Sequence, residues 1–271
     1  MLMFSRYEGK AWEDKFLPRL TSKGIAELPK ENALCILSLG AVEQHGYHLP
    51  VMTDALIGEA TLTQTFDKID PDEQIWNLPP LAYGKSNEHL GFAGTIALSA
   101  ATLQSIVTDI AHSLQRSGFR RLLLFNTHGG NMDMLNVIAR EVRIATGLMV
   151  FYLAPHSLDA ANDLMTPEEL EYGIHGGDYE TSIVKAIKPN WVHDELAVAE
   201  MVDLSQYEQL TLEGRVRFAW IMSDISESGV AGDATRATAD KGVIIQGRIT
   251  DFLAKAFVEL SRFEISDLRQ R

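Results

Sequence analysis

The feature that most constrains the fold is the alternation of short apolar runs with longer segments of helical periodicity. Short runs rich in branched apolar residues are typical of buried strands, and apolar residues three and four apart are typical of helices. Alternation with connections of this length favours a mainly parallel sheet with helices on both faces, a three-layer α/β sandwich. We expect strands at 34–39, 75–78, 120–125 and 148–153, and helices at 99–118, 131–146 and 241–262.

Capping residues mark several helix ends. Thr53 is expected to cap a further helix through its hydroxyl, and Ser99 is expected to do the same for the segment that follows it. Gly118 and Gly147 are expected to follow helix ends, where glycine is common. The 271 residues fit one large domain over 1–271 better than two small ones.

Composition excludes several classes of protein. The chain is 46% hydrophobic and 23% charged, which is sufficient for a sizeable core. A net charge of −13 argues against a nucleic-acid-binding surface and against docking on anionic membranes. No apolar run reaches transmembrane length, and residues 1–10 lack the apolar core of a signal peptide, so a cytoplasmic location is expected. The single cysteine, Cys35, is expected to be packed in a strand and not to act as a nucleophile.

Polar side chains that can bind a metal follow the first expected strand. Glu43 and His45 are two residues apart, so they point the same way if the chain stays extended. A second carboxylate, Asp54, follows nine residues after His45. Because ligands collect at the carboxyl ends of parallel strands, this segment resembles half of a metal site.

Two later segments carry similar residues. His128 lies in the Gly-rich turn 126–131, where it is either a metal ligand or a histidine that caps the next helix. A phosphate-binding turn is disfavoured there, because the segment has neither a P-loop lysine nor a GxGxxG pattern. Glu180 follows His175 in the segment 175–182; it is either a further ligand or an acidic residue in the first turn of a helix.

Together these residues indicate a catalytic centre with two metal ions. Imidazole and carboxylate ligands without a thiolate suit Zn, Mn or Fe in a catalytic site. One catalytic ion does not take five protein ligands, whereas two divalent ions on the order of 3.5–4 Å apart can share them through a bridging carboxylate. Asp54 is the expected bridge. The expected ligands are Glu43, His45, Asp54, His128 and Glu180.

The same residues resemble the creatininase (creatinine amidohydrolase) family. The resemblance covers roughly residues 30 to 255, with matching segments at 43–46, 53–54, 83–89, 94–96, 126–131, 175–182 and 229–233. It implies an α/β sandwich with a dinuclear metal centre, assembled as a homohexamer. It also implies that Glu43 and His128 bind one ion, His45 the other, and Asp54 both.

One position departs from the family pattern. Creatininase takes a metal-binding glutamate two positions after the histidine of the Gly-rich turn, and here that position is Gly130. The missing ligand must come from elsewhere, and Glu180 is the candidate. Since the pocket also differs where creatinine would lie, a substrate other than creatinine is expected.

The expected activity is that of a metal-dependent amidohydrolase. Hydroxide held by two ions would attack a carbonyl carbon, most directly of a small cyclic amide or another non-peptide C–N bond. His175 is the expected proton shuttle, with Glu180 also at the catalytic centre. Candidate substrate-binding residues are Ser86, His89 and Tyr179.

Other functions remain open from the sequence. Within the family they are a formamide deformylase, a cyclic ketone hydrolase and a peptide-trimming enzyme. A non-catalytic member could keep the metals or bind a ligand, and a nucleotide-binding module would depend only on Gly129 and Gly130. His48 is expected to lie behind the ligands, and His156 has no recognisable partner pattern.

Overall fold

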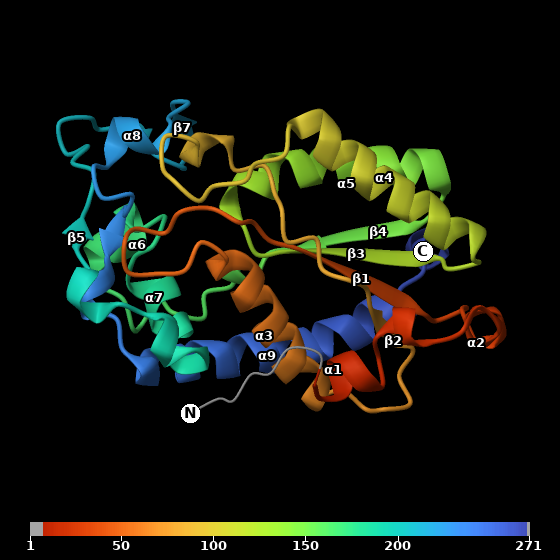
Figure 1. Cartoon of the computed structure of the whole chain (residues 1–271). Helices are drawn as coiled ribbons and strands as arrows, with labels where there is room; N and C mark the ends of the chain where they lie inside the picture. The colour runs from red at the N-terminus through yellow and green to blue at the C-terminus, as the bar shows by residue number, and fades with distance from the viewer. Residues whose placement is uncertain (1–7, 270–271) are drawn as a thin grey trace.

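A four-stranded parallel sheet forms the centre of the computed structural model, which describes residues 8–269 (Figure 1). The strand order is β2-β1-β3-β4, and Leu34 at the start of β1 pairs with Ile75 on one side and Arg121 on the other. The strands are β1 (Leu34–Leu39), β2 (Ile75–Asn77), β3 (Arg121–Asn126) and β4 (Met149–Leu153). All four expected strands are confirmed to within two residues at either end.

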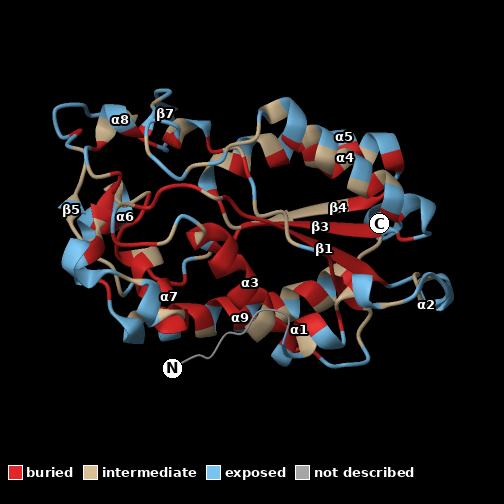
Figure 2. Cartoon of the chain, viewed as in Figure 1, coloured by how far each residue is buried: buried red, intermediate tan, exposed pale blue. Residues whose placement is uncertain are grey.

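Helices cover both faces of this sheet. Figure 1 shows α4 (Ala100–Arg116) and α5 (Met132–Thr146) on one face, with α3 (Thr53–Asp67), α9 (Ala239–Arg262) and the short α1 (Lys10–Glu13) on the other. Successive residues of β3 alternate between the faces: Leu123 and Phe125 pack in the core beneath α3 and α9, whereas Leu122 and Leu124 pack against α4 and α5. Strands β1, β2 and β3 are buried, and the edge strand β4 is mostly half-buried (Figure 2). Helices on both faces of the sheet confirm the three-layer α/β architecture.

Most of the expected helix ends are set by the capping residues named above. The Ser99 hydroxyl accepts a hydrogen bond from Thr102 N, and Gly147 ends α5 in the left-handed conformation at φ +75°, both as expected. The expectation that Thr53 caps its helix is wrong. The residue at the N-cap position is Met52; Thr53 is the first residue of α3, and its hydroxyl donates to Pro50 O at 2.7 Å.

Charged residues anchor the sheet at the amino ends of the strands. Arg121 begins β3 and is fully buried, with its guanidinium paired with Glu264 at 2.6 Å. The same guanidinium donates to the carbonyl oxygens of Glu31 and Phe263, so three segments are joined at this edge. A buried charge needs this degree of pairing.

Shorter elements gather beyond the carboxyl ends of the strands. The helices there are α6 (Pro167–Tyr172), α7 (Asp178–Ile187) and α8 (Met222–Ile225), with β5 (Ala199–Glu200) antiparallel to β8 (Gly232–Asp233) (Figure 1). Elsewhere lie α2 (Ser22–Glu27), β6 (Leu210–Thr211) and β7 (Val216–Arg217). Short 3-10 turns occur at Leu17–Arg19, Asn87–His89, Gly129–Asn131, Pro155–Ser157, Pro189–Trp191, Asp194–Leu196, Ala234–Arg236 and Ile265–Arg269.

Some expectations concern the chain ends or its surroundings. Among residues 8–269, none of the helices combines the length and apolar character needed to cross a membrane. The expected lack of a signal peptide concerns residues 1–10, of which the first seven lie outside the described part. The single domain over 1–271 and the cytoplasmic location stay predictions.

Candidate metal centre

The five expected ligands come together at the carboxyl ends of β1 and β3. Glu43 and His45 follow β1, Asp54 lies in the first turn of α3, His128 follows β3, and Glu180 lies in the first turn of α7. The first four side chains are buried, and Glu180 is partly buried. The edge of the parallel sheet therefore carries the site that its topology predicts.

A close approach of backbone segments brings Asp54 to this edge. A Cβ at Gly40, just after β1, would lie 2.9 Å from the Ala55 backbone nitrogen, so only glycine lets α3 begin this close to the strand. The intervening loop is closed by a hydrogen bond from Glu43 N to Val51 O at 2.7 Å. Glu43 and Asp54 are thus held side by side, although eleven positions separate them in the sequence.

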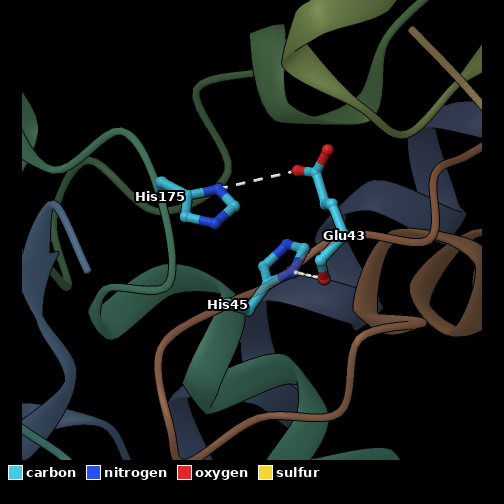
Figure 3. Close-up of side chains that lie close together, drawn as sticks. All are labelled: Glu43, His45 and His175. Atoms are coloured by element: carbon cyan, nitrogen blue, oxygen red, sulfur yellow. Dashed lines mark hydrogen bonds and ion pairs between the residues drawn. The ribbon is translucent and has the colours of Figure 1, made fainter. Parts of the chain in front are cut away.

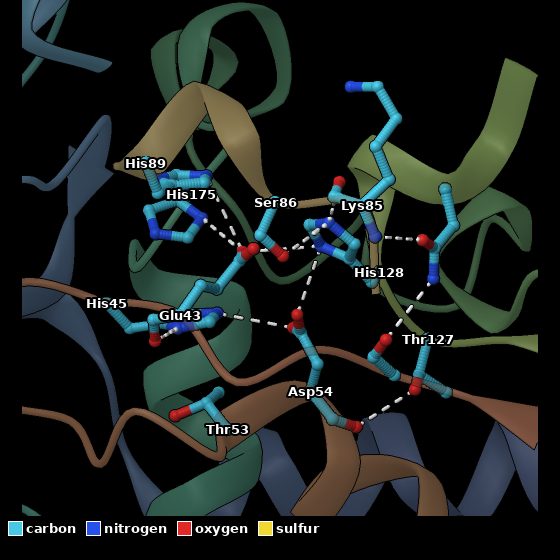
Figure 4. Close-up of polar contacts among 12 residues, drawn as sticks. Glu43, His45, Thr53, Asp54, Lys85, Ser86, His89, Thr127, His128 and His175 are labelled. Atoms are coloured by element: carbon cyan, nitrogen blue, oxygen red, sulfur yellow. Dashed lines mark hydrogen bonds and ion pairs between the residues drawn. The ribbon is translucent and has the colours of Figure 1, made fainter. Parts of the chain in front are cut away.

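The ligands form two clusters that share Asp54 (Figure 4). In one, His128 Nδ1 lies 3.3 Å from Glu43 Oε1 and 3.1 Å from Asp54 Oδ2. In the other, His45 Nε2 lies 3.2 Å from Asp54 Oδ1 and 3.8 Å from Glu180 Oε1. Each cluster could hold one ion, and the two oxygens of Asp54 face different clusters.

The remaining nitrogen of each imidazole faces a backbone carbonyl. His45 Nδ1 lies 3.1 Å from Glu43 O, and His128 Nε2 lies 3.0 Å from Lys85 O. A carbonyl oxygen only accepts hydrogen bonds, so these nitrogens carry the protons and the opposite nitrogens are left for the clusters. Metal-binding histidines are oriented in this way.

The electrostatics of the site favour positive charge. In the metal-free chain burial alone would raise the pKa of Glu43, but the protonated imidazoles of His128 and His89 together outweigh burial and lower it to about 2. The pKa of Asp54 is also lowered, because His45 and His128 outweigh its burial. Among the described residues, Glu43 Oε2 is buried without a hydrogen-bond partner, and buried Asp54 Oδ2 faces only His128 Nδ1, at 3.1 Å. Buried carboxylates with free oxygens are paired or coordinate metals, so the donor set fits divalent cations.

Three imidazoles stack beside these clusters. The rings of His45 and His175 have centroids 4.2 Å apart, and those of His175 and His89 are also 4.2 Å apart. His175 Nδ1 lies 3.8 Å from Glu43 Oε1 (Figure 3), and its Nε2 lies 2.6 Å from Gln44 O. Burial lowers the pKa of His175, so the neutral form is favoured. Its position beside Glu43 suits either the expected shuttle or a metal ligand.

The candidate substrate-binding residues divide into two groups. Ser86 Oγ lies 3.3 Å from His128 Nε2, and His89 Nε2 lies 3.5 Å from Glu43 Oε1, so both are beside the clusters. Burial lowers the pKa of His89 to about 3. Tyr179 instead packs against the core beneath α3 and α9, and burial raises the pKa of its hydroxyl. His48 lies behind the ligands as expected, with Nε2 at 2.8 Å from Thr181 Oγ1.

Comparisons with known proteins agree with this geometry. A family model described as Creatininase: Creatinine amidohydrolase matches residues 18–257. The chain belongs to the creatininase family. A relative named mycofactocin precursor peptide peptidase, from Mycobacterium ulcerans (strain Agy99), is 32% identical over 241 residues, covering 87% of this chain and 88% of the relative.

Creatininase itself is also similar. The creatinine amidohydrolase of Pseudomonas putida is 33% identical over 195 residues, covering 65% of this chain and 73% of the relative. A solved structure of a mutant creatininase described as Zn-Zn type has a TM-score of 0.71 and 28% identity, covering 92% of this chain and 98% of that chain. Both the family and the fold expected from the sequence are therefore confirmed.

Glu88 lies beside the candidate centre, although the sequence did not single it out. A Cβ at Gly130 would overlap the Glu88 carboxylate, so Glu88 fills the space that a side chain at 130 would take. Its Oε1 lies 3.7 Å from His128 Nε2, and with Glu43 and His89 it forms a further group within reach of an ion. Creatininase has a glutamate at the position that corresponds to Gly130. In this chain the Glu88 carboxylate lies where a side chain at 130 would begin.

His156 is a second residue that the sequence did not connect to the site. It lies just beyond the carboxyl end of β4, and its side chain is exposed. The surrounding protein nevertheless lowers its pKa, an effect that the charges of Glu180 and Asp54 oppose. The charges of Glu180 and Asp54 therefore act on His156. In the sequence, only its position directly after an expected strand could have indicated a link to the site.

Proposed function

We propose that this chain is a dinuclear metal-dependent hydrolase that cleaves an amide bond of a peptide substrate. Glu43, Asp54 and His128 would hold one ion, and His45, Asp54 and Glu180 the other. The observation that carries the proposal is the division of the Asp54 oxygens, one facing His45 and the other His128. The ligand chemistry suits Zn, Mn or Fe.

Two divalent cations supply Lewis-acid chemistry, which activates water near neutral pH and polarises a carbonyl group. The protein's part is to hold and orient the reacting groups. Backbone carbonyls fix the rings of His45 and His128, and burial keeps His175 neutral and able to accept a proton at Nδ1. Ser86 and His89 lie where they could contact a substrate, so they stay candidates for that role.

The relatives support a peptide substrate more than the small cyclic amide expected first. The mycofactocin precursor peptide peptidase matches over most of both chains, whereas the creatinine amidohydrolase match is shorter. Glu88 also occupies the space that a side chain at position 130 would take, so the site differs at this place from the creatininase pattern of a glutamate two residues after the histidine. A small cyclic amide is kept as the second candidate substrate because creatinine amidohydrolase is itself among the relatives.

The test compares substrates on metal-loaded protein. Protein reconstituted with Zn²⁺ or Mn²⁺ is incubated with a library of short peptides and with creatinine, and the products are followed by mass spectrometry. We expect close to two ions per chain and release of residues from a peptide. Fully loaded protein that cleaves neither substrate class would support a non-catalytic member instead.

A carboxylate substitution tests the metal assignment itself. Asp54→Ala should remove both ions and the activity, because both clusters use this residue. Asp251→Asn is the matched control, since Asp251 is an exposed carboxylate that pairs with Lys68 away from the clusters. Retention of both ions by the Asp54→Ala protein would refute the bridging role. The homohexamer implied by the family also stays a prediction, which light scattering checks.

A further inference from the structure

Gln44 lies between two expected ligands, Glu43 and His45, and its side chain points to other partners. It is 4% exposed, and its amide has three neighbours. Gly46 N donates to Gln44 Oε1 at 2.8 Å, while Gln44 Nε2 lies 3.0 Å from Gly229 O and 2.9 Å from His89 Nδ1. The amide thus joins three segments that are far apart in the sequence.

Two of these partners fix which end of the amide is oxygen. A backbone N–H can only donate, so the atom facing Gly46 must be Oε1. A backbone carbonyl can only accept, so the atom facing Gly229 must be the NH₂ group. The usual ambiguity of a glutamine side chain is therefore absent here. Gln44 must donate its second N–H to His89.

This donation determines the state of His89. A ring nitrogen that accepts a hydrogen bond carries no proton, so His89 Nδ1 is bare and the ring is neutral. The single ring proton is then on Nε2, which lies 3.5 Å from Glu43 Oε1. His89 therefore presents an N–H to the carboxylate of Glu43 (Figure 4).

The backbone of Gln44 determines the state of His175 in the same way. His175 Nε2 lies 2.6 Å from Gln44 O, which only accepts, so the proton is on Nε2. In the neutral ring Nδ1 is bare, and it faces Glu43 Oε1 at 3.8 Å (Figure 3). The two rings stack with centroids 4.2 Å apart. Both carry the proton on Nε2, but they present opposite ends to Glu43.

We propose that Gln44 is the positioning residue that gives these stacked histidines opposite roles, with His89 as hydrogen-bond donor and His175 as proton acceptor. The proposal deepens the proposed function and rests on it. A hydrolase needs one proton acceptor beside Glu43, and His175 can serve as that acceptor only if His89 does not accept protons there as well. Gly229 supports the arrangement: it has φ +83°, and a Cβ there would overlap the Gln44 amide. Because residue 229 has no side chain, the Gln44 amide has room to contact both Gly229 O and His89 Nδ1.

The variant Gln44→Glu tests the amide without changing its shape. A carboxylate can accept from Gly46 N but cannot donate to Gly229 O or to His89 Nδ1. His89 should then take up a proton at Nδ1. His175 should keep its proton on Nε2, because its partner is the backbone oxygen at position 44, which the substitution does not remove.

Long-range ¹H–¹⁵N NMR of zinc-loaded protein with ¹⁵N-labelled histidine distinguishes these states. Signals are assigned from the variants His89→Asn and His175→Asn. In the unsubstituted protein we expect both rings to be protonated on Nε2, and in the Gln44→Glu protein only His89 should change. The kcat for a cleaved peptide should fall by about tenfold or more, with a smaller change in KM, because a positive charge on His89, stacked 4.2 Å from the His175 ring, disfavours proton uptake at His175 Nδ1.

Gln246→Glu is the matched control, because Gln246 is a buried residue of α9 that accepts a hydrogen bond from Thr61 Oγ1 of α3. Gln246→Glu also puts a carboxylate in place of a buried amide, but in a side chain whose hydrogen bond is to Thr61 and not to His89 or His175. It should therefore lower the free energy of unfolding without altering the histidine signals. A proton on Nδ1 of His89 in the unsubstituted protein would overturn the proposal, whether or not any variant folds. An unchanged His89 in folded Gln44→Glu protein would also overturn it. If the tautomers are as expected but no substrate is cleaved, the proposed function fails and the role of Gln44 as tautomer-setting residue stands.

Discussion

Glu169 accepts a hydrogen bond at Oε1 from the backbone N–H of Asp178, the first residue of α7, at 2.7 Å. Its Oε2 accepts another from Asp233 N at 2.8 Å, and the side chain is 4% exposed. Side chains at three glycines would overlap or crowd this carboxylate; these positions are Gly173, Gly177 and Gly232. Because α7 carries Glu180 in its first turn, Glu169 positions one edge of the candidate metal centre.

The variant Glu169→Gln should lower both stability and metal affinity. The amide can accept only one of the two backbone hydrogen bonds, and leaving one buried N–H unpaired costs about 2 kcal/mol. Metal affinity should fall at the cluster that contains Glu180. Chemical unfolding and competition with a chelator measure the two effects. The control is Glu264→Gln at the opposite edge of the sheet, which should lose stability and keep its metals. Equal metal affinities in the two variants would contradict the positioning role.

Metal content should separate Glu180 from Glu88 as the fifth ligand. Glu180→Gln removes a carboxylate 3.8 Å from His45 Nε2, and we expect the protein to keep close to one ion per chain. Glu88 faces Nε2 of His128, the nitrogen next to Lys85 O and not the one that faces Asp54, so we expect Glu88→Gln to keep both ions. Elemental analysis after dialysis measures both. The reverse result would make Glu88 the ligand and Glu180 a residue of the helix start.

His156→Gln should lower the catalytic rate and leave the metal content unchanged. The charges of Glu180 and Asp54 act on the His156 imidazole, which is accessible to solvent. We expect this ring to exchange protons with substrate, and losing such a group costs on the order of a hundredfold in kcat. The control is His193→Gln, since the exposed His193 side chain pairs only with Glu195 among the described residues, and its backbone hydrogen bond to His48 O does not depend on the side chain. Steady-state kinetics across pH measure the effect. Identical pH profiles for the two variants would exclude His156 from the reaction.

Acid should destabilise the metal-free protein partly through Glu43. Its pKa in the folded chain, about 2, is below the ordinary value of 4.5. The ionised form therefore stabilises the fold above pH 4.5, and this contribution is lost as pH falls from 4.5 towards 2. Urea unfolding in the presence of a chelator, at several pH values in this window, should show a steeper loss for the unsubstituted protein than for Glu43→Gln. Parallel curves would mean that Glu43 is not held as a stabilised carboxylate.

Short-range patterns in the sequence predicted most of the central fold, and they singled out the five side chains that the fold brings together as candidate ligands. Leu34–Leu39 is recognisable as a strand from its own composition, and Ser99 and Gly147 act within one helical turn of themselves. Thr53 was assigned the wrong role because its hydroxyl has a nearer partner in the preceding loop, Pro50 O. The elements beyond the strands, α6 and α8 among them, are too short to show periodicity.

Residues that act through distant partners were not predictable in this way. Gln44 contacts Gly229, 185 positions later, and Glu169 contacts Asp233. Nothing local distinguishes such side chains from ordinary polar residues. Glu88 was hidden for a related reason: its role depends on the absence of a side chain at Gly130, which only the folded chain brings beside it.

The ion pair between Arg121 and Glu264 lies at the opposite end of the strands from the ligands. The buried ion pair that holds the strands therefore lies at one end of the sheet, and the candidate metal centre lies at the other. Side chains on the loops at the carboxyl edge can be exchanged while the opposite edge keeps the strands in register. A scaffold of this kind can acquire a new specificity without first becoming more stable, in keeping with relatives that include both a peptide peptidase and a creatinine amidohydrolase.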